Sequence, residues 1–143
     1  MNRIAHRGNI SGINLARENK IDYLQEALDA GYWVECDIQY TDDGLYLGHD
    51  EPQEYAPINL MRHSRVICHA KDLDSVILLD RIGAHYFWHE TDRITLTSKG
   101  YMWCYPGEHI NHSKAIWLDL ADISLPNDIP DSIFGICADD FTK

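Results

Sequence analysis

Side chains able to do acid–base and metal chemistry occur close to short apolar runs in the first third of the sequence. His6 and Arg7 directly follow one such run, and His49 follows a later one. Glu35 and Asp37 are two positions apart in an alternating run, so a strand would place both carboxylates on one face. Carboxylates bind hard divalent cations, and histidine exchanges protons near neutral pH. The set indicates a site for a hard divalent cation, with histidines at neighbouring strand ends.

Each of these signals also has an ordinary explanation. A Glu-x-Asp pair on a strand is commonly a solvated face, and a single histidine at a strand end is commonly a surface residue. What favours a site is that all of them occur together, in order, at positions where strands are expected. Polar groups at strand ends are how α/β proteins assemble many of their sites.

Strands and helices are needed to bring these residues together. Apolar and alternating patterns predict strands at 3–6, 33–40, 45–49, 65–70 and 84–89, with a turn at Asp43-Gly44. Helices are predicted at 20–30, with Asn19 as N-cap and Gly31 as its end, and at 72–82, capped by Asp72 and ended by Gly83. Residues 51–64 are expected to be a loop. The strand–helix–strand order around residues 65–89 predicts a parallel sheet.

The second half of the chain is less regular. Residues 94–97 and 101–105 are expected to form either a hairpin around 98–100 or two passes of a barrel. Short apolar runs at 115–120 and 135–138 predict the last two strands, and few helices are expected after Gly83. Asp139-Asp140 is expected to be a solvated pair, the alternative being a carboxylate near the site.

Composition and charge limit the class of protein. The chain has 143 residues, 45% hydrophobic and 24% charged, which predicts one globular domain over residues 1–143. It carries 12 Lys and Arg against 23 Asp and Glu, a net charge of −11, which argues against nucleic acid as a partner. There is no apolar stretch of membrane-spanning length and no signal segment, and the four cysteines lie in apolar runs without close pairing. We therefore expect a cytoplasmic protein with reduced core cysteines.

A set of motifs gives this pattern a family resemblance. The motifs are Ile4-Ala5-His6-Arg7-Gly8, Glu18-Asn19, Val34-Glu35-Cys36-Asp37-Ile38-Gln39, Thr41-Asp42-Asp43-Gly44 and His49-Asp50, with weaker matches at Trp103-Cys104-Tyr105 and Gly135–Asp139. Together they resemble the glycerophosphodiester phosphodiesterase family. The resemblance implies a TIM-barrel-like hydrolase of small phosphodiesters with one divalent metal ion.

The resemblance also implies roles for individual residues. His6 and His49 would be the general acid and base, and Arg7 would bind phosphate. Glu35 and Asp37 would hold the metal, with Glu18 as a further contact. The metal is expected to be Mg²⁺, with Mn²⁺, Ca²⁺ and Zn²⁺ as alternatives.

The resemblance is incomplete at the next strand, where the family has a Glu-x-Lys pattern. Lys71 matches the lysine and is expected to bind phosphate, but His69 stands where the glutamate would be. An imidazole ligand at His69 would tolerate Mn²⁺ or Zn²⁺ better than Ca²⁺. His89 and Trp103 are candidates for lining the substrate pocket, the alternatives being a surface position for His89 and a core position for Trp103.

The chain is also short for the family. A full barrel of this type needs about 200 residues or more. We therefore expect a compact or incomplete TIM-barrel-like (β/α) barrel with several crossover helices shortened or missing, and a homodimer that covers the exposed strand faces. The expected function is metal-dependent phosphodiester hydrolysis. The alternative is an inactive module that binds phosphate or metal in the same pocket.

Overall fold

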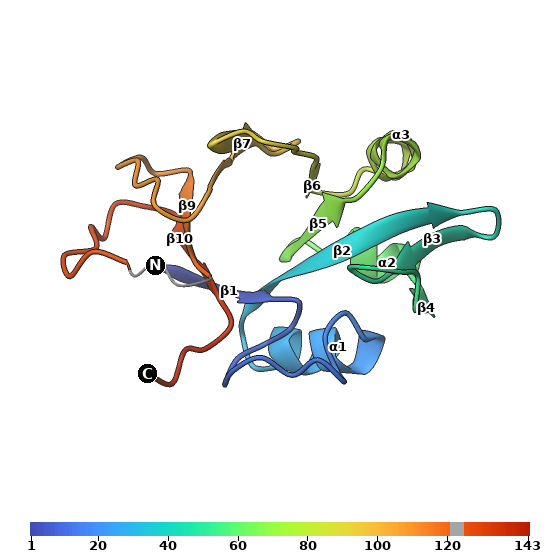
Figure 1. Cartoon of the computed structure of the whole chain (residues 1–143), viewed down its shortest axis with the longest axis horizontal. Coiled ribbons are helices and arrows are strands. Elements are labelled where there is room, and N and C mark those ends of the chain that lie inside the picture. The colour runs from blue at the N-terminus through green and yellow to red at the C-terminus, as the bar shows by residue number, and fades with distance from the viewer. Residues whose placement is uncertain (121–124) are drawn as a thin grey trace.

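The computed structural model describes residues 1–120 and 125–143. Within them, ten strands form one mostly parallel sheet, accompanied by three short helices (Figure 1). The strands are β1 Asn2–His6, β2 Trp33–Thr41, β3 Gly44–Leu47, β4 Glu54–Tyr55, β5 Val66–Ala70, β6 Tyr86–Phe87, β7 Ile94–Leu96, β8 Met102–Cys104, β9 Ala115–Asp119 and β10 Gly135–Ala138. The helices are α1 Ile21–Asp29, α2 Ile58–Met61 and α3 Leu73–Arg81.

Strand β2 is the branch point of the sheet. It pairs in parallel with β1 and β5 and in antiparallel fashion with β3, and β5 pairs in turn with β6. On the other side, β1 pairs with β10, β10 with β9 and β9 with β8, all in parallel. Parallel pairing thus joins seven of the described strands, and the residues at their carboxyl ends lie at one end of the sheet.

The expected barrel is shown only in part. The α/β class and the parallel pairing are confirmed, but the sheet is open: in the described residues no strand pairing closes it into a barrel. Its β6 edge approaches the turn after β7, where the Ser98 amide donates to the Tyr86 carbonyl at 2.7 Å and the Tyr86 amide donates to Ser98 Oγ at 2.9 Å. Two such bonds hold these segments together without forming a ladder.

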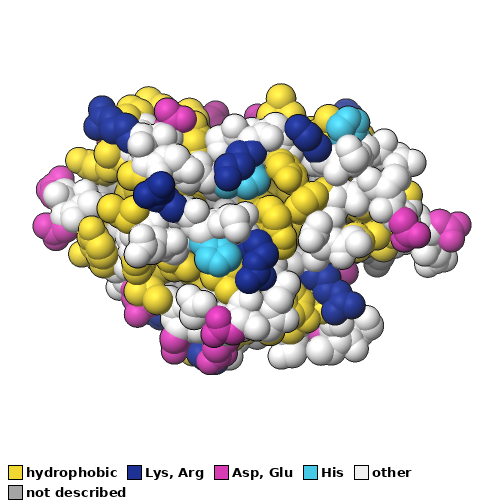
Figure 2. Space-filling model, turned by 180° about the vertical axis from the view of Figure 1, so that it is seen from behind, with side chains coloured by type: hydrophobic (Ala, Val, Ile, Leu, Met, Phe, Trp, Pro, Cys, Tyr) yellow, Lys and Arg dark blue, Asp and Glu magenta, His cyan; other side chains and the backbone are white. Residues whose placement is uncertain are grey.

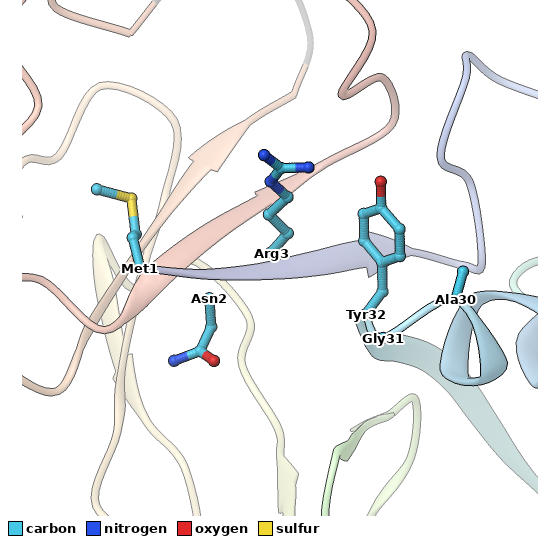
Figure 3. A pocket seen from close by; sticks show the side chains of 6 residues that line it. All are labelled: Met1, Asn2, Arg3, Ala30, Gly31 and Tyr32. Carbon is cyan, nitrogen blue, oxygen red and sulfur yellow. The ribbon is translucent and has the colours of Figure 1, made fainter.

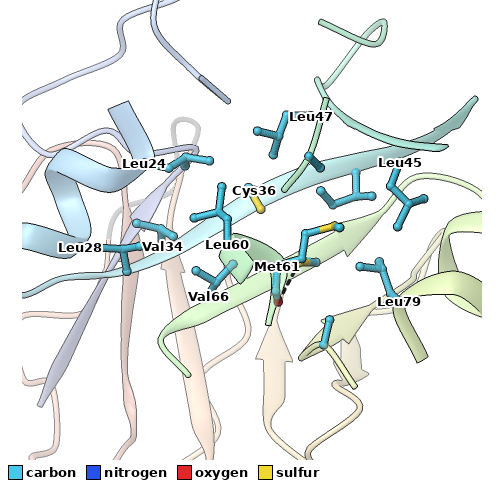
Figure 4. Close-up of a cluster of buried hydrophobic side chains, with 14 of the residues drawn as sticks. Leu24, Leu28, Val34, Cys36, Leu45, Leu47, Leu60, Met61, Val66 and Leu79 are labelled. Carbon is cyan, nitrogen blue, oxygen red and sulfur yellow. Dashed lines mark hydrogen bonds between the residues drawn. The ribbon is translucent and has the colours of Figure 1, made fainter. Parts of the chain in front are cut away.

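The largest core cluster lies between the helices and β2, β3 and β5. Val34, Cys36 and Ile38 point from β2 into this cluster, where they meet Leu24 and Leu28 of α1 (Figure 4). Because side chains alternate along a strand, Glu35 and Asp37 must point to the other face. The alternation in the sequence therefore predicted correctly which residues of β2 are structural and which face the site.

All three helices lie beside the half of the sheet that contains β2, β3 and β5 (Figure 1). As expected, the described residues after Gly83 form no helix. The outer face of β8 and β9 is covered instead by irregular segments, through Ile110, Leu125, Ile129 and Ile133. The chain thus covers part of the face for which a second subunit was expected, and dimerisation stays a prediction.

Several local expectations need correction. Residues 51–64 are not only a loop, because they contain β4 and α2. The strand expected at 84–89 shrinks to Tyr86–Phe87, while residues 94–96 and 102–104 form the antiparallel hairpin. The expected cap of α3 is confirmed, because the Asp72 carboxylate accepts from the Ser75 amide at 2.8 Å. Asn19 does not cap α1: the cap position is Lys20, and the Asn19 side chain bonds elsewhere.

Surface charge and the cysteines complete the description. On the face shown in Figure 2, Lys, Arg and His side chains are spread over the centre, while acidic side chains lie toward the margins. The net charge of −11 is therefore unevenly distributed over the molecule.

The four cysteines are buried and free, as expected. Among the described residues, no helix is both long and apolar enough to span a membrane.

Candidate functional site

The carboxyl ends of β1, β2, β5 and β10 bring most of the sequence-predicted residues together. A pocket of about 270 Å³ opens there, and it is lined by His6, Arg7, Glu35, His49, His69, Lys71, His89, Trp103, Tyr105, Pro106, Leu118 and Leu120. One wall is ionic and the other is aromatic and aliphatic. Eight of the ten predicted site residues line this pocket; Glu18 and Asp37 lie just behind Arg7 and Glu35.

Three side chains in this pocket form a group that could hold a metal ion. One ligand atom each from Glu35, Asp37 and His69 lie within 4.8 Å of one another. Glu35 is 2% exposed and Asp37 is fully buried. Glu35 Oε1 and Asp37 Oδ1 are buried with no hydrogen-bond donor. Buried carboxylate oxygens need such a partner, so the pair fits a bound cation.

His69 completes this group from β5. Its Nδ1 lies 3.2 Å from Asp37 Oδ1 and 3.7 Å from Glu35 Oε2. The ring stacks on Phe87, with centroids 4.6 Å apart, and on His89, at 4.8 Å. This stacking fixes the orientation of the ring. An imidazole thus stands at the position where the resemblance implies a carboxylate. Two carboxylates and an imidazole suit borderline metals as well as Mg²⁺.

The electrostatics keep Asp37 ionised. Burial alone would raise its pKa, but the nearby His69 ring, the charge of Arg7 and the amide of Asn19 hold the pKa well below its usual range. Asn19 Nδ2 donates to Asp37 Oδ2 at 2.9 Å, and its Oδ1 accepts from the Asp37 amide at 2.9 Å. The residue expected to cap α1 therefore orients a metal-ligand candidate instead.

His6 is held by a residue from the other end of the chain. Its Nδ1 lies 2.8 Å from Asp139 Oδ1, and its Nε2 is 3.9 Å from Glu35 Oε1, in the pocket. Burial alone would lower the pKa of His6, but the hydrogen bond to Asp139 and the charges of Glu35 and Asp139 raise it above its usual value. The expectation of a solvated carboxylate at Asp139 was wrong, because this side chain is half-buried and bonded to His6.

His49 reaches the pocket from its outer rim. Its side chain is 41% exposed, and Nδ1 lies 2.7 Å from Asp50 Oδ1. Both candidate acid–base histidines thus have Nδ1 next to an aspartate. This arrangement leaves the Nε2 atom of each ring for a substrate.

Arg7 and Glu18 form an ion pair behind the pocket. Arg7 Nε lies 3.0 Å from Asp37 Oδ2, and its NH1 lies 3.5 Å from Glu18 Oε1. The other Glu18 oxygen accepts from Asn9 Nδ2 at 2.6 Å. Since both oxygens have these partners, the structure places Glu18 outside the group that could hold a metal. Asn9 Nδ2 also donates to Asp139 Oδ1 at 2.8 Å, so Asn9 links the carboxylates of Glu18 and Asp139.

The backbone is left-handed at two of these residues. Arg7 has φ 56° and Asn19 has φ 59°, and neither is glycine. Such conformations are costly and are found where the surroundings enforce them, commonly at functional sites. Here the Arg7 amide donates to the Glu35 carbonyl at 2.8 Å and the Asn19 amide donates to the Arg7 carbonyl at 3.1 Å. The turn after β1 is thereby tied to β2.

The remaining predicted residues differ in exposure. Lys71 faces the pocket and, among the described residues, makes no ion pair. His89 is half-buried between His69 and Tyr105, whose hydroxyl contacts its ring nitrogens. Trp103 is 3% exposed and stacks on Phe87, so it is a core residue with one edge at the pocket.

Replacing Asp139 by asparagine should lower the pKa of His6, because an anionic acceptor for Nδ1 is lost. Histidine NMR titration of the metal-free protein measures this shift. Asp140→Asn is the matched control, since among the described residues the Asp140 carboxylate accepts hydrogen bonds only from Thr142. An unchanged His6 titration in the Asp139 variant would contradict the assignment.

Sequence reasoning missed the contacts of Asn9 and Tyr105 and gave Asn19 another role. Asp139 was considered as a carboxylate near the site, and it directly follows the predicted strand 135–138, which lies beside the strand of His6. Asn9 and Tyr105 had no readable signal, because no local pattern relates them to Asp139 and His89. A separate hollow of about 340 Å³ lies at the start of β1, lined by Met1, Asn2, Arg3, Ala30, Gly31 and Tyr32 (Figure 3). It is at the other end of β1 from His6 and holds no carboxylate, histidine or cysteine.

Comparison with known proteins adds no relative. No family model matches the chain, and neither a curated protein nor a solved structure is similar to it at a significant level.

Proposed function

We propose that this chain is a metal-dependent phosphodiester hydrolase that uses His6 and His49 as an acid–base pair. The observation that carries the proposal is the juxtaposition at the pocket floor. Two buried carboxylate oxygens without donors lie beside His69 Nδ1, and a histidine held by an aspartate points its free nitrogen toward them. The motifs that resemble glycerophosphodiester phosphodiesterases supply the same residues.

Glu35, Asp37 and His69 would hold the metal. A divalent ion bound there would withdraw charge from a phosphate oxygen and orient the attacking group. The chain's own part is to supply one imidazole and two carboxylates from adjacent strands, already packed in position. Asn19 donates to Asp37 Oδ2 and Arg7 forms an ion pair with the same oxygen, so Oδ1 would be free to hold the metal.

His6 and His49 would transfer the protons. One neutral ring must accept a proton from the attacking hydroxyl, and one protonated ring must release the leaving alkoxide. Asp139 and Asp50 hold the two Nδ1 atoms, so each ring presents Nε2. Either ring can take either part, because both have the same arrangement of Nδ1 beside an aspartate.

Lys71 and Arg7 would bind the phosphate. Lys71 is the cation with no carboxylate partner among the described residues that line the pocket, so its ammonium is available to an anion. Arg7 borders the same pocket but is already paired with Asp37 and Glu18. Local cations of this kind draw an anionic substrate into a chain of net charge −11.

The proposal extends to the architecture. The neighbour order β6-β5-β2-β1-β10-β9-β8 matches the path of a (β/α) barrel, and the two Tyr86–Ser98 hydrogen bonds lie where such a barrel would close. A reduced barrel of the phosphodiesterase type is therefore our interpretation of the open sheet.

The test is hydrolysis by the purified protein, first stripped with chelator and then loaded with Mg²⁺, Mn²⁺, Ca²⁺ or Zn²⁺. The substrates are a panel of small glycerophosphodiesters and one chromogenic diester. We expect turnover that needs metal and disappears with chelator. Metal bound with no turnover of any diester would favour the alternative, an inactive module that keeps the pocket.

A further inference from the structure

The middle of the loop from β1 to α1 carries no charge, although it lies beside an ionic site. Residues 8–16 read Gly-Asn-Ile-Ser-Gly-Ile-Asn-Leu-Ala, without one charged side chain in a chain that is 24% charged. Leu15 is 81% exposed and Ile13 is 66% exposed. Large aliphatic side chains that stand together in solvent mark interaction surfaces.

The exposure of these side chains is not due to a loose loop. The Gly12 amide donates to the Asp139 carbonyl at 2.9 Å, and Ser11 forms a bridge with Asp140. The Asn14 amide donates to the buried Asn9 side chain at 3.3 Å. Ile10 packs against the core, while Ile13 and Leu15 point outward. The fold therefore fixes two aliphatic side chains in solvent.

Leu15 stands at the rim of the candidate site. It lines a hollow of about 260 Å³ together with Arg7, Glu18, Asn19 and His49. Arg7 and His49 also line the site pocket, so the two hollows are contiguous. Trp88 is 41% exposed and follows β6 at the same end of the sheet.

We propose that Ile13 and Leu15 dock on a zwitterionic phospholipid surface, so that the substrate is a phosphodiester carried by an amphiphile. The substrate part rests on the function proposed above. The lipid is zwitterionic because residues 8–16 carry no Lys or Arg and the neighbouring Arg17 is already paired with Asp22 and Glu26. The net charge of −11 is in addition repelled by anionic surfaces. Two aliphatic side chains give weak, reversible attachment to the lipid surface, which suits an enzyme that must dissociate after each reaction.

The experiment measures binding without turnover. The chain in the His6→Ala form, without metal, is mixed with vesicles of a phosphocholine lipid and sedimented. Ile13→Ser and Leu15→Ser should each lower the partition coefficient about tenfold, the effect of removing one buried aliphatic side chain. Leu96→Ser is the matched control and should bind unchanged. Leu96 is 67% exposed, but it pairs with Met102 at the opposite end of the sheet.

Three results would overturn the docking surface. They are equal binding by the Ile13 and Leu15 variants and the parent, absence of vesicle binding by the parent, and a dimer in light scattering that these substitutions convert to a monomer. The last result would assign the loop to a second copy of the chain. Binding is measured without catalysis, so the two proposals can fail separately. If the parent binds vesicles, the Ile13 and Leu15 variants do not, and no diester is hydrolysed, the docking surface stands and only the hydrolase is rejected.

Discussion

Replacing His6 by alanine should lower phosphodiester turnover by about 10²- to 10⁴-fold, the usual contribution of a general acid or base. The structure gives the reason, since His6 is the histidine whose Nδ1 is fixed by Asp139 and whose Nε2 faces the carboxylate pair. His49→Ala should cost a similar factor. The measurement is kcat at saturating metal and substrate for each variant.

The controls separate chemistry from folding. Metal binding should survive in His6→Ala, because Glu35, Asp37 and His69 are untouched. Added imidazole should restore part of the turnover if the ring transfers a proton. His112→Ala is the matched histidine control, since His112 lies before β9, at the other end of the sheet, and within the described part of the chain its ring accepts only from the Lys114 amide. Near-normal turnover in both the His6 and His49 variants would reject the acid–base assignment.

Replacing Glu35 by glutamine and Asp37 by asparagine should both abolish metal binding but change stability in opposite directions. The nearest cationic partners of Glu35 are 3.7 and 3.9 Å away, and its Oε1 has no donor. Removing its charge relieves repulsion from Asp37, so the metal-free Glu35→Gln protein should be more stable by about 1 kcal/mol. Asp37→Asn loses short pairings with Arg7 and His69, and it should be less stable by about 3 kcal/mol.

Thermal unfolding with and without each metal measures both effects. The parent should gain stability with metal, because an ion that binds only the folded state stabilises that state. Both variants should lose this gain, and turnover should be lost with it. Asp42→Asn, at an exposed position on the β2–β3 turn, is the matched carboxylate control. A full metal-induced gain in Glu35→Gln would place the ion elsewhere.

Local patterns predicted much of this protein. The alternation in β2 assigned Glu35 and Asp37 to one face and Val34 and Cys36 to the core, and the structure agrees. The capping residue Asp72 and the ending residue Gly83 framed α3 correctly. These features depend on neighbours within a few positions, where backbone periodicity and turn chemistry dominate.

The rest depended on contacts that local patterns do not contain. Asn19 has the residue type and the position of a helix cap. Its side-chain amide donates to the buried Asp37 carboxylate instead, and α1 begins without a side-chain cap. Residues 51–64 looked polar, yet Leu60 and Met61 pack into the core and form α2. The coverage of β8 and β9 by irregular segments could not be foreseen, because no periodic pattern marks them.

The pairing of β1 with β10 ties the assembly of the pocket to the order of synthesis. His6 and Asp139 are 133 positions apart, and they meet because the first strand lies in register beside the last. Contacts of such long range form late and slow folding. The seam is also tight: a Cβ on Gly135 would lie 2.4 Å from the Asn2 carbonyl oxygen. Until β10 has been synthesised and has paired with β1, the nascent chain can present Glu35 and Asp37 but not a His6 ring held by Asp139, so the pocket is completed only by that pairing.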